Sequence, residues 1–318
     1  MINRDMLLPI AGRKMLLPVS SIHNPLEWAK NNREDIDSFL SVNGALLIRG
    51  LPVNNSGLFA ETLAALFNEQ LISYTYRSTP RTALQNNIYT ATEYHPSEEI
   101  PQHNENAYAA SWPMRIGFLC LQPAAKRGNT PVSDSREAYR QIPAEIKEEF
   151  ERKKIMYVRN YSSIDLPWQE VFQTTSKAEV EKYCLEHQLQ YEWLGNDGLR
   201  TKQVNQATIN HPVTGEKLWF NQAHLFHVSS LGPAMQEDLV SLLGEENLPR
   251  NACFGDGTPI DTEALSGIRE VYNKTKFSFQ WEKNDLLLLD NMLYTHGREP
   301  FEGQRQVLVG MACEFFNH

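Results

Sequence analysis

The chain has 318 residues, of which 41% are hydrophobic, 10% aromatic and 22% charged. This is the composition of an ordinary globular protein, and it excludes disordered, collagen-like and coiled-coil chains. With 30 Lys and Arg against 39 Asp and Glu, the net charge is −9. The broad positive field that attracts nucleic acid or anionic membranes is therefore missing, and we expect no nucleic-acid partner.

The apolar segments are too short for a membrane protein. The longest aliphatic run, Leu286–Leu289, falls far below the ~18 consecutive apolar residues of a membrane span. Met1–Lys14 mixes charged with apolar residues and lacks the small-residue cleavage site of a signal peptide. The four cysteines are far apart, without a Cys-x-x-Cys pair, which is typical of structural thiols. We expect a cytoplasmic protein with no membrane partner.

The first part of the chain predicts helices around one short strand. Asn24-Pro25 is a typical helix start, apolar residues continue at helical spacing to Leu40, and Gly44 ends the pattern. Ala45–Arg49 has the character of a short buried strand. Ser56 is expected to cap a second helix with one apolar face.

From Thr82 onward the pattern changes to short strands and turns, interrupted by polar helices. Neither repeats nor a linker occur, so we expect one domain over 1–318, with a helical N-terminal part and an insertion around 161–206. Many short strands with helical insertions predict a mainly β fold with a double-stranded β-helix core, the jelly roll of cupins. The predicted strands are Met114–Leu121, Ile155–Tyr161, Gln190–Leu194, Leu218–Phe220, Leu286–Leu289 and Gln306–Met311; the helices are Pro143–Lys154, Ser176–Leu189, Pro233–Leu243 and Asp261–Lys274; turns are expected around Pro212–Gly215 and at His296-Gly297.

His103 and Glu105 form a His-x-Glu pair. In an extended segment, residues two apart project from the same face, so this imidazole and carboxylate can converge on one ion. His296 follows an apolar strand and stands beside Gly297, where a missing side chain leaves room for a ligand. Two His and one carboxylate form the facial triad of non-haem Fe(II) oxygenases. The His-x-Glu pair alone is equally typical of a surface turn.

Arg305 and Thr130 suit a keto-acid cosubstrate. Arg305 begins the last predicted strand, and a guanidinium is well matched to a carboxylate in a partly buried pocket. Thr130 follows Gly128-Asn129 in a predicted turn, where its hydroxyl can donate a second hydrogen bond. Arg298 is the alternative anchor, because it has the same strand parity as His296.

Three parts of the chain, taken together, resemble the taurine dioxygenase/clavaminate-synthase-like superfamily of Fe(II)- and 2-oxoglutarate-dependent oxygenases. The resemblance extends from about Gly44 to the C-terminus. The matching residues are His103-Asn104-Glu105, Gly128-Asn129-Thr130, and His296-Gly297-Arg298-Glu299-Pro300-Phe301 with Gly303 and Arg305.

This resemblance implies a double-stranded β-helix that uses Fe(II), 2-oxoglutarate and O2. It implies that His103, Glu105 and His296 hold the iron and that Arg305 and Thr130 anchor 2-oxoglutarate. Taurine dioxygenase has a second Arg for the sulfonate four residues past its keto-acid Arg, where this chain has Val309, so taurine is not the expected substrate. The related halogenases leave the carboxylate position open for chloride, and Glu105 fills it, which disfavours halogenation.

The implied reaction is hydroxylation, desaturation or epoxidation of a small polar metabolite in a specialised biosynthetic pathway. An amino acid, a peptide or an aminoacyl group tethered to a carrier protein would fit this class. Two alternatives stay open: a non-catalytic, metal-binding cupin-like binding or sensor protein, and a zinc hydrolase that uses His224 and His227. The candidate substrate contacts are Asn106, Tyr108, Asn221 and His224.

The insertion around 161–206 is long for a connection between strands. Such segments are commonly lids, so part of it, with the turn Gly195–Gly198, is expected to cover the iron site. The amphipathic spacing of Val180 and Cys184 equally predicts a helix that supports the outside of the barrel.

Overall fold

The computed structural model describes residues 4–73, 76, 78–79, 81–162, 164–195 and 197–317. Helix α1 (Pro25–Asn43) begins after Asn24, whose side chain accepts a hydrogen bond from a backbone N–H of the first turn, and it ends at Gly44, which has a φ of 83°. A residue with positive φ ends a helix at little cost when it is glycine. Both predicted ends of this helix are confirmed.

The second helix, α2 (Ser56–Phe67), begins where predicted but has a different cap. Asn55 is the capping residue, because its Oδ1 accepts the N–H of Leu58 at 2.9 Å. A cap must remain extended while its side chain reaches the free amides of the first turn. Asn55 is extended, with a φ of −153°, whereas Ser56 already belongs to the helix, so the prediction that Ser56 is the cap was wrong.

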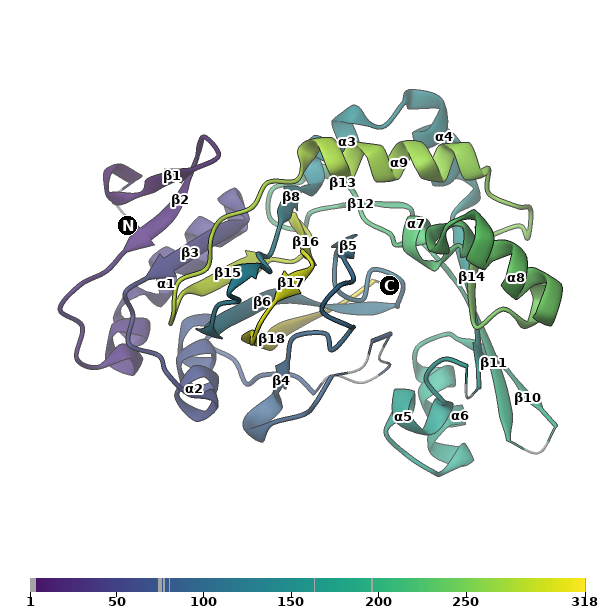
Figure 1. Cartoon of the computed structure of the whole chain (residues 1–318), viewed down its shortest axis with the longest axis horizontal. Helices are drawn as coiled ribbons and strands as arrows, with labels where there is room; N and C mark the ends of the chain where they lie inside the picture. Colours follow the sequence, from purple (N-terminus) through teal and green to yellow (C-terminus); the bar gives the residue numbers. More distant parts are fainter. Residues whose placement is uncertain are drawn as a thin grey trace.

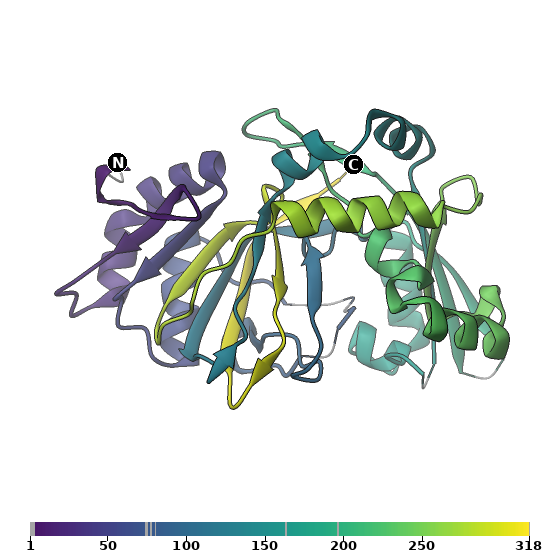
Figure 2. The ribbon, with the colours of Figure 1, turned by 45° about the horizontal axis from the view of Figure 1, so that its top comes forward.

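Two facing sheets form the core of the molecule. Among the described residues, the larger sheet has the strand order β1-β2-β3-β15-β6-β18-β4 and the smaller one the order β5-β16-β8. In both sheets the C-terminal strands β15, β16 and β18 lie between strands from earlier in the chain (Figures 1 and 2). The strands are β1 (Leu8–Ile10), β2 (Arg13–Pro18), β3 (Ala45–Arg49), β4 (Ile88–Thr90), β5 (Ile100–His103), β6 (Ser111–Gln122), β8 (Val132–Asp134), β15 (Leu286–Asp290), β16 (Tyr294–Arg298) and β18 (Gln306–Phe316).

Strand β15 shows why this part of the sequence is an unbroken aliphatic run. Leu287 and Leu289 pack into the space between the two sheets, while Leu286 and Leu288 pack with residues of α1 and α2 on the outer face of the larger sheet. Successive side chains of a strand point to opposite faces, so a strand covered on both faces is apolar throughout. The sheets and their helical cover make a double-stranded β-helix, as predicted.

A second unit lies beside the jelly roll, at the right of Figure 1. Its sheet has the order β10-β11-β9-β14 and packs with its helices around a separate apolar cluster. Helix α9 runs along the top of both parts in Figures 1 and 2. These elements are α3 (Ser135–Gln141), α4 (Ala144–Lys153), β9 (Ile155–Tyr161), α5 (Trp168–Phe172), α6 (Lys177–Glu186), β10 (Gln190–Leu194), β11 (Gly198–Asn205), β14 (Arg250–Phe254) and α9 (Thr262–Thr275).

Shorter elements complete the described chain. The predicted turn around Pro212–Gly215 joins two antiparallel strands, β12 and β13. The remaining elements are η1 (Arg4–Met6), η2 (Gln85–Asn87), β7 (Lys126–Arg127), β12 (Thr208–Asn210), β13 (Lys217–Trp219), α7 (Ala223–Phe226), η3 (Val228–Leu231), α8 (Pro233–Leu243), η4 (Glu245–Asn247) and β17 (Phe301–Glu302).

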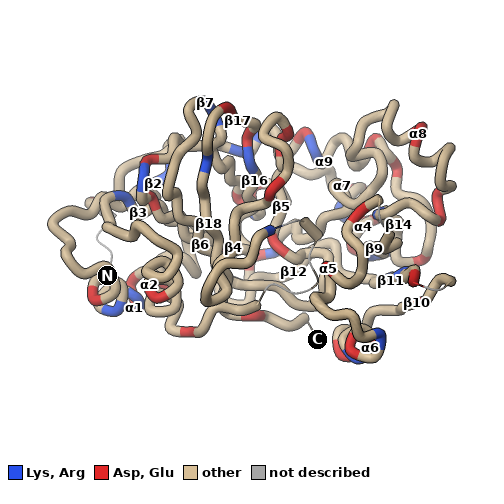
Figure 3. The backbone as a smooth tube through the Cα atoms, turned by 60° about the horizontal axis from the view of Figure 1, so that its bottom comes forward, with Lys and Arg blue, Asp and Glu red and all other residues tan. Residues whose placement is uncertain are grey.

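Acidic and basic residues are interspersed along the chain (Figure 3). Helix α6, for example, has both signs of charge within three turns. Within the described ranges, none of the helices has the length and apolar character needed to cross a membrane.

Candidate active site

Two neighbouring strands bring the predicted metal ligands together. β5 and β16 are antiparallel, and His103 is the register partner of His296. Their ring centroids are 4.4 Å apart. Glu105 follows β5, and its Oε2 lies 3.8 Å from Nε2 of His296. The donor atoms of all three residues lie within 4.8 Å of one another, and all three side chains are buried.

The state of the two imidazoles suits metal binding. Nδ1 of His103 lies 2.8 Å from the Pro101 carbonyl oxygen. A carbonyl oxygen can only accept, so Nδ1 carries the proton and Nε2 keeps its lone pair. Burial lowers the pKa of His103. Burial also lowers the pKa of His296 well below its usual value, and the neighbouring His103 lowers it further. Both rings are therefore neutral near pH 7, as metal ligands must be.

The donor set fits a divalent iron. Two neutral imidazoles and one carboxylate on one face leave the opposite coordination positions for other ligands, which is the arrangement of non-haem Fe(II) oxygenases. Nδ1 of His296 is buried and has no hydrogen-bond partner among the described residues. Nε2 of the same ring faces the Glu105 carboxylate and is the nitrogen available to an ion.

The backbone of Glu105 is held by Asn291. The Glu105 N–H donates to Asn291 Oδ1 at 2.7 Å, and Asn291 Nδ2 donates to the carbonyl oxygens of Glu105 and Pro113, both at 2.9 Å. Asn291 lies in the turn 291–293, which separates β15 from β16. The turn that was predicted at His296-Gly297 is therefore wrong, because both residues lie within β16.

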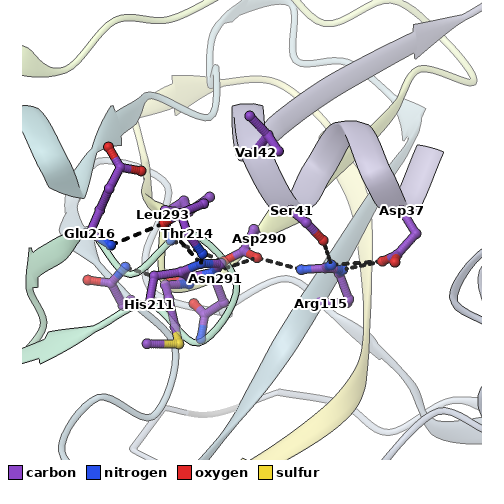
Figure 4. A network of polar contacts seen from close by, with 12 residues as sticks. Asp37, Ser41, Val42, Arg115, His211, Thr214, Glu216, Asp290, Asn291 and Leu293 are labelled. Atoms are coloured by element: carbon purple, nitrogen blue, oxygen red, sulfur yellow. Dashed lines mark hydrogen bonds and ion pairs between the residues drawn. The ribbon is translucent and has the colours of Figure 1, made fainter. Parts of the chain in front are cut away.

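A buried polar network supports this turn (Figure 4). Asp290 Oδ1 accepts the backbone N–H groups of Met292 and Leu293, which shapes the turn that carries Asn291. Oδ2 of Asp290 pairs with Arg115 and lies 3.1 Å from Nε2 of His211. Arg115 also donates to two side chains of α1, so the network joins the first helix to the residue that clamps Glu105.

A small cavity beside the histidines contains Arg305 and Thr130. Arg305 Nε donates to the Gly128 carbonyl oxygen at 2.8 Å, and its Nη2 lies 3.4 Å from Thr130 Oγ1. That hydroxyl oxygen also accepts the indole N–H of Trp281 at 3.1 Å. With both lone pairs of its oxygen engaged, Thr130 has its own O–H to donate to an incoming group.

Arg305 has the charge and the setting for an anionic ligand. Burial, assisted by the nearby charge of Arg298, lowers its pKa to about 10. The guanidinium is thus still a cation at pH 7, and within the described part of the chain it forms no ion pair with a carboxylate. A partly buried guanidinium with no anion is unfavourable, so a carboxylate ligand would stabilise it.

Two glycines shape this region in different ways. Gly128 has a φ of 72°, and a Cβ on it would lie 2.8 Å from Cβ of Phe301 and 3.2 Å from Cδ of Arg305, so this glycine makes room for both side chains. Gly297 was expected to leave room for a ligand. A Cβ there would lie 2.5 Å from the Ile100 carbonyl oxygen and 2.8 Å from Gln102 Nε2. Its missing side chain thus admits the neighbouring strand β5, and the expectation was wrong.

Arg298, the alternative anchor, is engaged by the protein itself. Its two terminal nitrogens donate to four backbone carbonyl oxygens of the loop 92–98, at 2.8–3.2 Å. These bonds use all four terminal N–H groups, which are the ones that grip a carboxylate in the forked manner. Arg298 therefore holds the loop 92–98, although it also lines the small cavity.

A second, much larger cavity of about 650 Å³ also borders the metal ligands. His103 and Glu105 form part of its wall. Asp165 and Arg250 lie in the same wall and form a forked ion pair, with distances of 2.5 and 2.7 Å. The other residues of the wall are Ser78, Thr79, Tyr94, Glu98, Glu99, Ile100, Pro101, Ile164, Gln222, Leu225, Phe226, Val228, Ser230, Leu231, Met235, Leu239, Leu248 and Pro249.

The structure places the four predicted substrate contacts outside this wall. Tyr108 donates to the carbonyl oxygen of Tyr76, and His224 donates through Nε2 to that of Gln102. Both amide ends of Asn221 bind neighbouring backbone. Asn106 lies at a separate small pocket. Gln222, the residue after the predicted Asn221, lines the large cavity instead. The roles predicted for these four in substrate binding remain predictions.

Two further expectations can be compared with the geometry. His224 and His227 are each hydrogen-bonded within the protein. The ligand group found among the described residues is His103, Glu105 and His296, so the zinc-hydrolase alternative has no support.

The insertion contributes to the large cavity through Ile164 and Asp165. Its helix α6 packs Val180 and Cys184 into the apolar cluster of the second unit, as a support would. Asn196, in the turn that was expected to form a lid, lies outside the described residues. The described residues of that turn line neither cavity.

Comparison with known proteins shows the family of the chain. The profile of the family described as "Taurine catabolism dioxygenase TauD, TfdA family" matches residues 13–312. The chain belongs to this family. It is an Fe(II)- and 2-oxoglutarate-dependent oxygenase, so the alternative of a non-catalytic sensor is set aside.

Among curated relatives, the dapdiamide synthesis protein DdaC of Enterobacter agglomerans is 42% identical over 277 residues, covering 87% of this chain and 84% of the relative. A clavaminate synthase-like protein of Arabidopsis thaliana is 27% identical over 309 residues, covering 93% and 90%.

Solved structures show the same fold. AAD-2 in complex with Mn(II) and N-oxalylglycine has a TM-score of 0.56 at 12% identity, covering 94% of this chain and 93% of that one. Asparagine oxygenase in complex with Fe(II), 3-hydroxyasparagine and succinate has a TM-score of 0.54 at 14% identity, covering 90% and 83%. At these identities the likeness concerns the fold alone.

Proposed function

We propose that His103, Glu105 and His296 hold the Fe(II) of this oxygenase, and that Arg305 and Thr130 anchor 2-oxoglutarate. The observation that carries the proposal is the position of the three donors between two cavities. His103 lines both cavities. Arg305 and Thr130 lie in the wall of the small cavity, and the large cavity has most of the empty space. Cosubstrate and substrate would then approach the same ion from different sides.

Bound Fe(II) would supply O2 activation coupled to oxidative decarboxylation of 2-oxoglutarate. The side chains of this chain supply the rest. His103, Glu105 and His296 occupy one face of the ion, and Arg305 with Thr130 orients the cosubstrate by its distal carboxylate. Phe118, whose ring lies 5.0 Å from that of His296, is an apolar wall of the small cavity and excludes water there.

The large cavity indicates the class of substrate. Its volume of about 650 Å³ lies within the range of pockets for drug-sized ligands, and it therefore has room for more than a free amino acid. Its wall combines apolar side chains with Asp165, Arg250 and Gln222, which suits a ligand with both amide and apolar parts. The similarity to a protein named for dapdiamide synthesis supports a peptide-like substrate in specialised metabolism. We therefore place an amino-acid or peptide-like group, free or carrier-tethered, in this cavity.

A single substitution tests the metal site. Glu105→Ala removes the anionic ligand, so the variant should bind Fe(II) or Mn(II) far more weakly and form no succinate from 2-oxoglutarate. Glu302→Ala is the matched control, because Glu302 is an exposed carboxylate on β17 whose side chain is 69% exposed. Equal metal affinity and equal succinate formation in the two variants would contradict the assignment.

The substrate class needs a separate measurement. Amino acids, dipeptides and carrier-tethered aminoacyl groups would be incubated with enzyme, Fe(II), 2-oxoglutarate and O2, and the products analysed by mass spectrometry. We expect peptide-like compounds to gain one oxygen atom, as in hydroxylation or epoxidation, or to lose two hydrogen atoms, as in desaturation. Turnover confined to compounds without an amide or amino-acid group would refute the assignment of the large cavity.

A further inference from the structure

Arg81 is a buried cation placed against a metal ligand. It lies between α2 and β4, and its Nη2 donates to Glu105 Oε2 at 2.7 Å. Both side chains are 3% exposed. A charge-assisted hydrogen bond of this length holds the carboxylate of Glu105 in one orientation. The sequence contained no motif that marked Arg81.

Arg81 places a positive charge on the Glu105 carboxylate, where a divalent metal ion is also expected to bind. Two cationic groups beside one buried carboxylate leave positive charge uncompensated, which is costly in a buried site. A further anion next to the metal would therefore stabilise this arrangement.

Arg81 also lines the small cavity together with His103, His296, Thr130 and Arg305. Arg305 is bonded to the turn that carries Thr130, whereas Arg81 is bonded to Glu105 at the metal ligands. The two guanidinium groups thus stand at different places in one cavity, and a dicarboxylate can meet one of them with each end. Among the described residues, Arg81 is part of the small cavity wall and not of the large one.

We propose that Arg81 forms a second carboxylate subsite of this pocket. It binds the carboxylate that lies beside the metal, the 1-carboxylate of 2-oxoglutarate, while it keeps Glu105 oriented. Arg305 binds the distal carboxylate. This inference rests on the proposed function, and it assigns recognition of the two ends of the cosubstrate to two different arginines. A substrate carboxylate is the other possible source of the anion, and the large cavity would be its route.

A matched pair of ligands separates the two arginines. N-oxalylglycine has an oxalyl group for the metal and a distal carboxylate, and oxamate keeps the oxalyl group but lacks the distal carboxylate. Binding of each would be measured on Mn(II)-loaded enzyme by water-proton relaxation, without turnover, in wild type and in Arg81→Gln, Arg81→Lys and Arg305→Gln. A separate Mn(II) titration and a thermal melt of each variant give metal affinity and folding.

The two arginines should give different patterns. Arg81→Gln should weaken both ligands by a similar factor of about ten to a hundred, since a hydrogen bond to a charged group is lost in both cases. Arg81→Lys should lose less, because it keeps the charge. Arg305→Gln should weaken N-oxalylglycine and leave oxamate unchanged. Mn(II) affinity should stay within a few-fold of wild type in all three variants; Arg81→Gln loses the hydrogen bond that orients Glu105, but it also loses a positive charge beside the ion, and the two effects oppose each other.

Other patterns would overturn the inference. Wild-type binding of both ligands by Arg81→Gln would remove the subsite and, if substrate affinity fell, would assign Arg81 to the substrate carboxylate. Loss of Mn(II) binding in Arg81→Gln and Arg81→Lys alike would make Arg81 a support for Glu105 only. Failure of the wild-type enzyme to bind N-oxalylglycine at all would instead contradict the proposed function, so the two failures are distinguishable.

Discussion

Asn291 allows a quantitative test of how the protein positions a metal ligand. Its side chain is fully buried and makes three hydrogen bonds to backbone groups, two of them to Glu105. Asn291→Ala leaves one N–H and two carbonyl groups without their partner. Each buried group left unpaired costs about 1–3 kcal/mol, and water entering the space that Ala leaves recovers part of this. We expect a loss of about 3–5 kcal/mol in the free energy of unfolding.

The loss is large enough to measure by calorimetry. With an unfolding entropy of about 2.1 cal/mol/K per residue, a chain of 318 residues should melt about 5–7 °C lower. Asn273→Ala is the control, because Asn273 is an exposed residue of α9 and should change stability by less than about 0.5 kcal/mol. Asn291→Asp should lose at least as much as Asn291→Ala, since it keeps the acceptor for the Glu105 N–H but places a buried carboxylate against the carbonyl oxygens of Glu105 and Pro113.

The same variants test whether the clamp serves the metal. Asn291→Ala should bind Mn(II) more weakly at a temperature where it is fully folded, because Glu105 is no longer held in place. A melting temperature within a degree of wild type would refute the energetic argument. A lower melting temperature with unchanged Mn(II) affinity would show that Asn291 stabilises the fold without positioning the ligand.

Three further predictions follow from the same geometry. Arg305→Lys should keep wild-type Mn(II) affinity but bind N-oxalylglycine about tenfold more weakly by calorimetry, because an ammonium cannot bind a carboxylate in the forked manner; equal affinity would contradict the anchor. Burial lowers the pKa of His224 from 6.5 to about 4, so protons bind the unfolded chain more readily than the folded one between these pH values. The free energy of unfolding should therefore fall by about 3 kcal/mol as the pH is lowered from 6.5 to 4. His224→Gln, which keeps an N–H donor for Gln102, should show a smaller loss between these pH values in urea titrations, and an identical pH dependence would refute this account. Burial raises the pKa of Cys120 to about 12, so iodoacetamide at pH 8 should label it in urea and not in the native protein, as peptide mass spectrometry can show.

Local sequence patterns determined several helices and strands, and they also identified the residues of the proposed metal site. The start and end of α1 follow from Asn24 and Gly44, because capping depends on a few neighbouring residues. The aliphatic run at β15 identified a strand covered on both faces. The His-x-Glu pair, the distant His296 and the resemblance that they carry identified the oxygenase family, since a metal restricts which side chains can bind it.

Only the tertiary structure decided what surrounds these residues. The pairing of β5 with β16 brings His103 to His296, and no local pattern specifies which distant strands pair. Arg81 and Asn291 have ordinary sequence contexts, and they reach Glu105 because the chain folds back to it. The cavity wall includes Gln222 rather than the predicted Asn221, because the backbone path through this segment determines which side chain faces inward. Burial is a property of the whole fold, and burial is what lowers the pKa values of His103, His296 and Arg305.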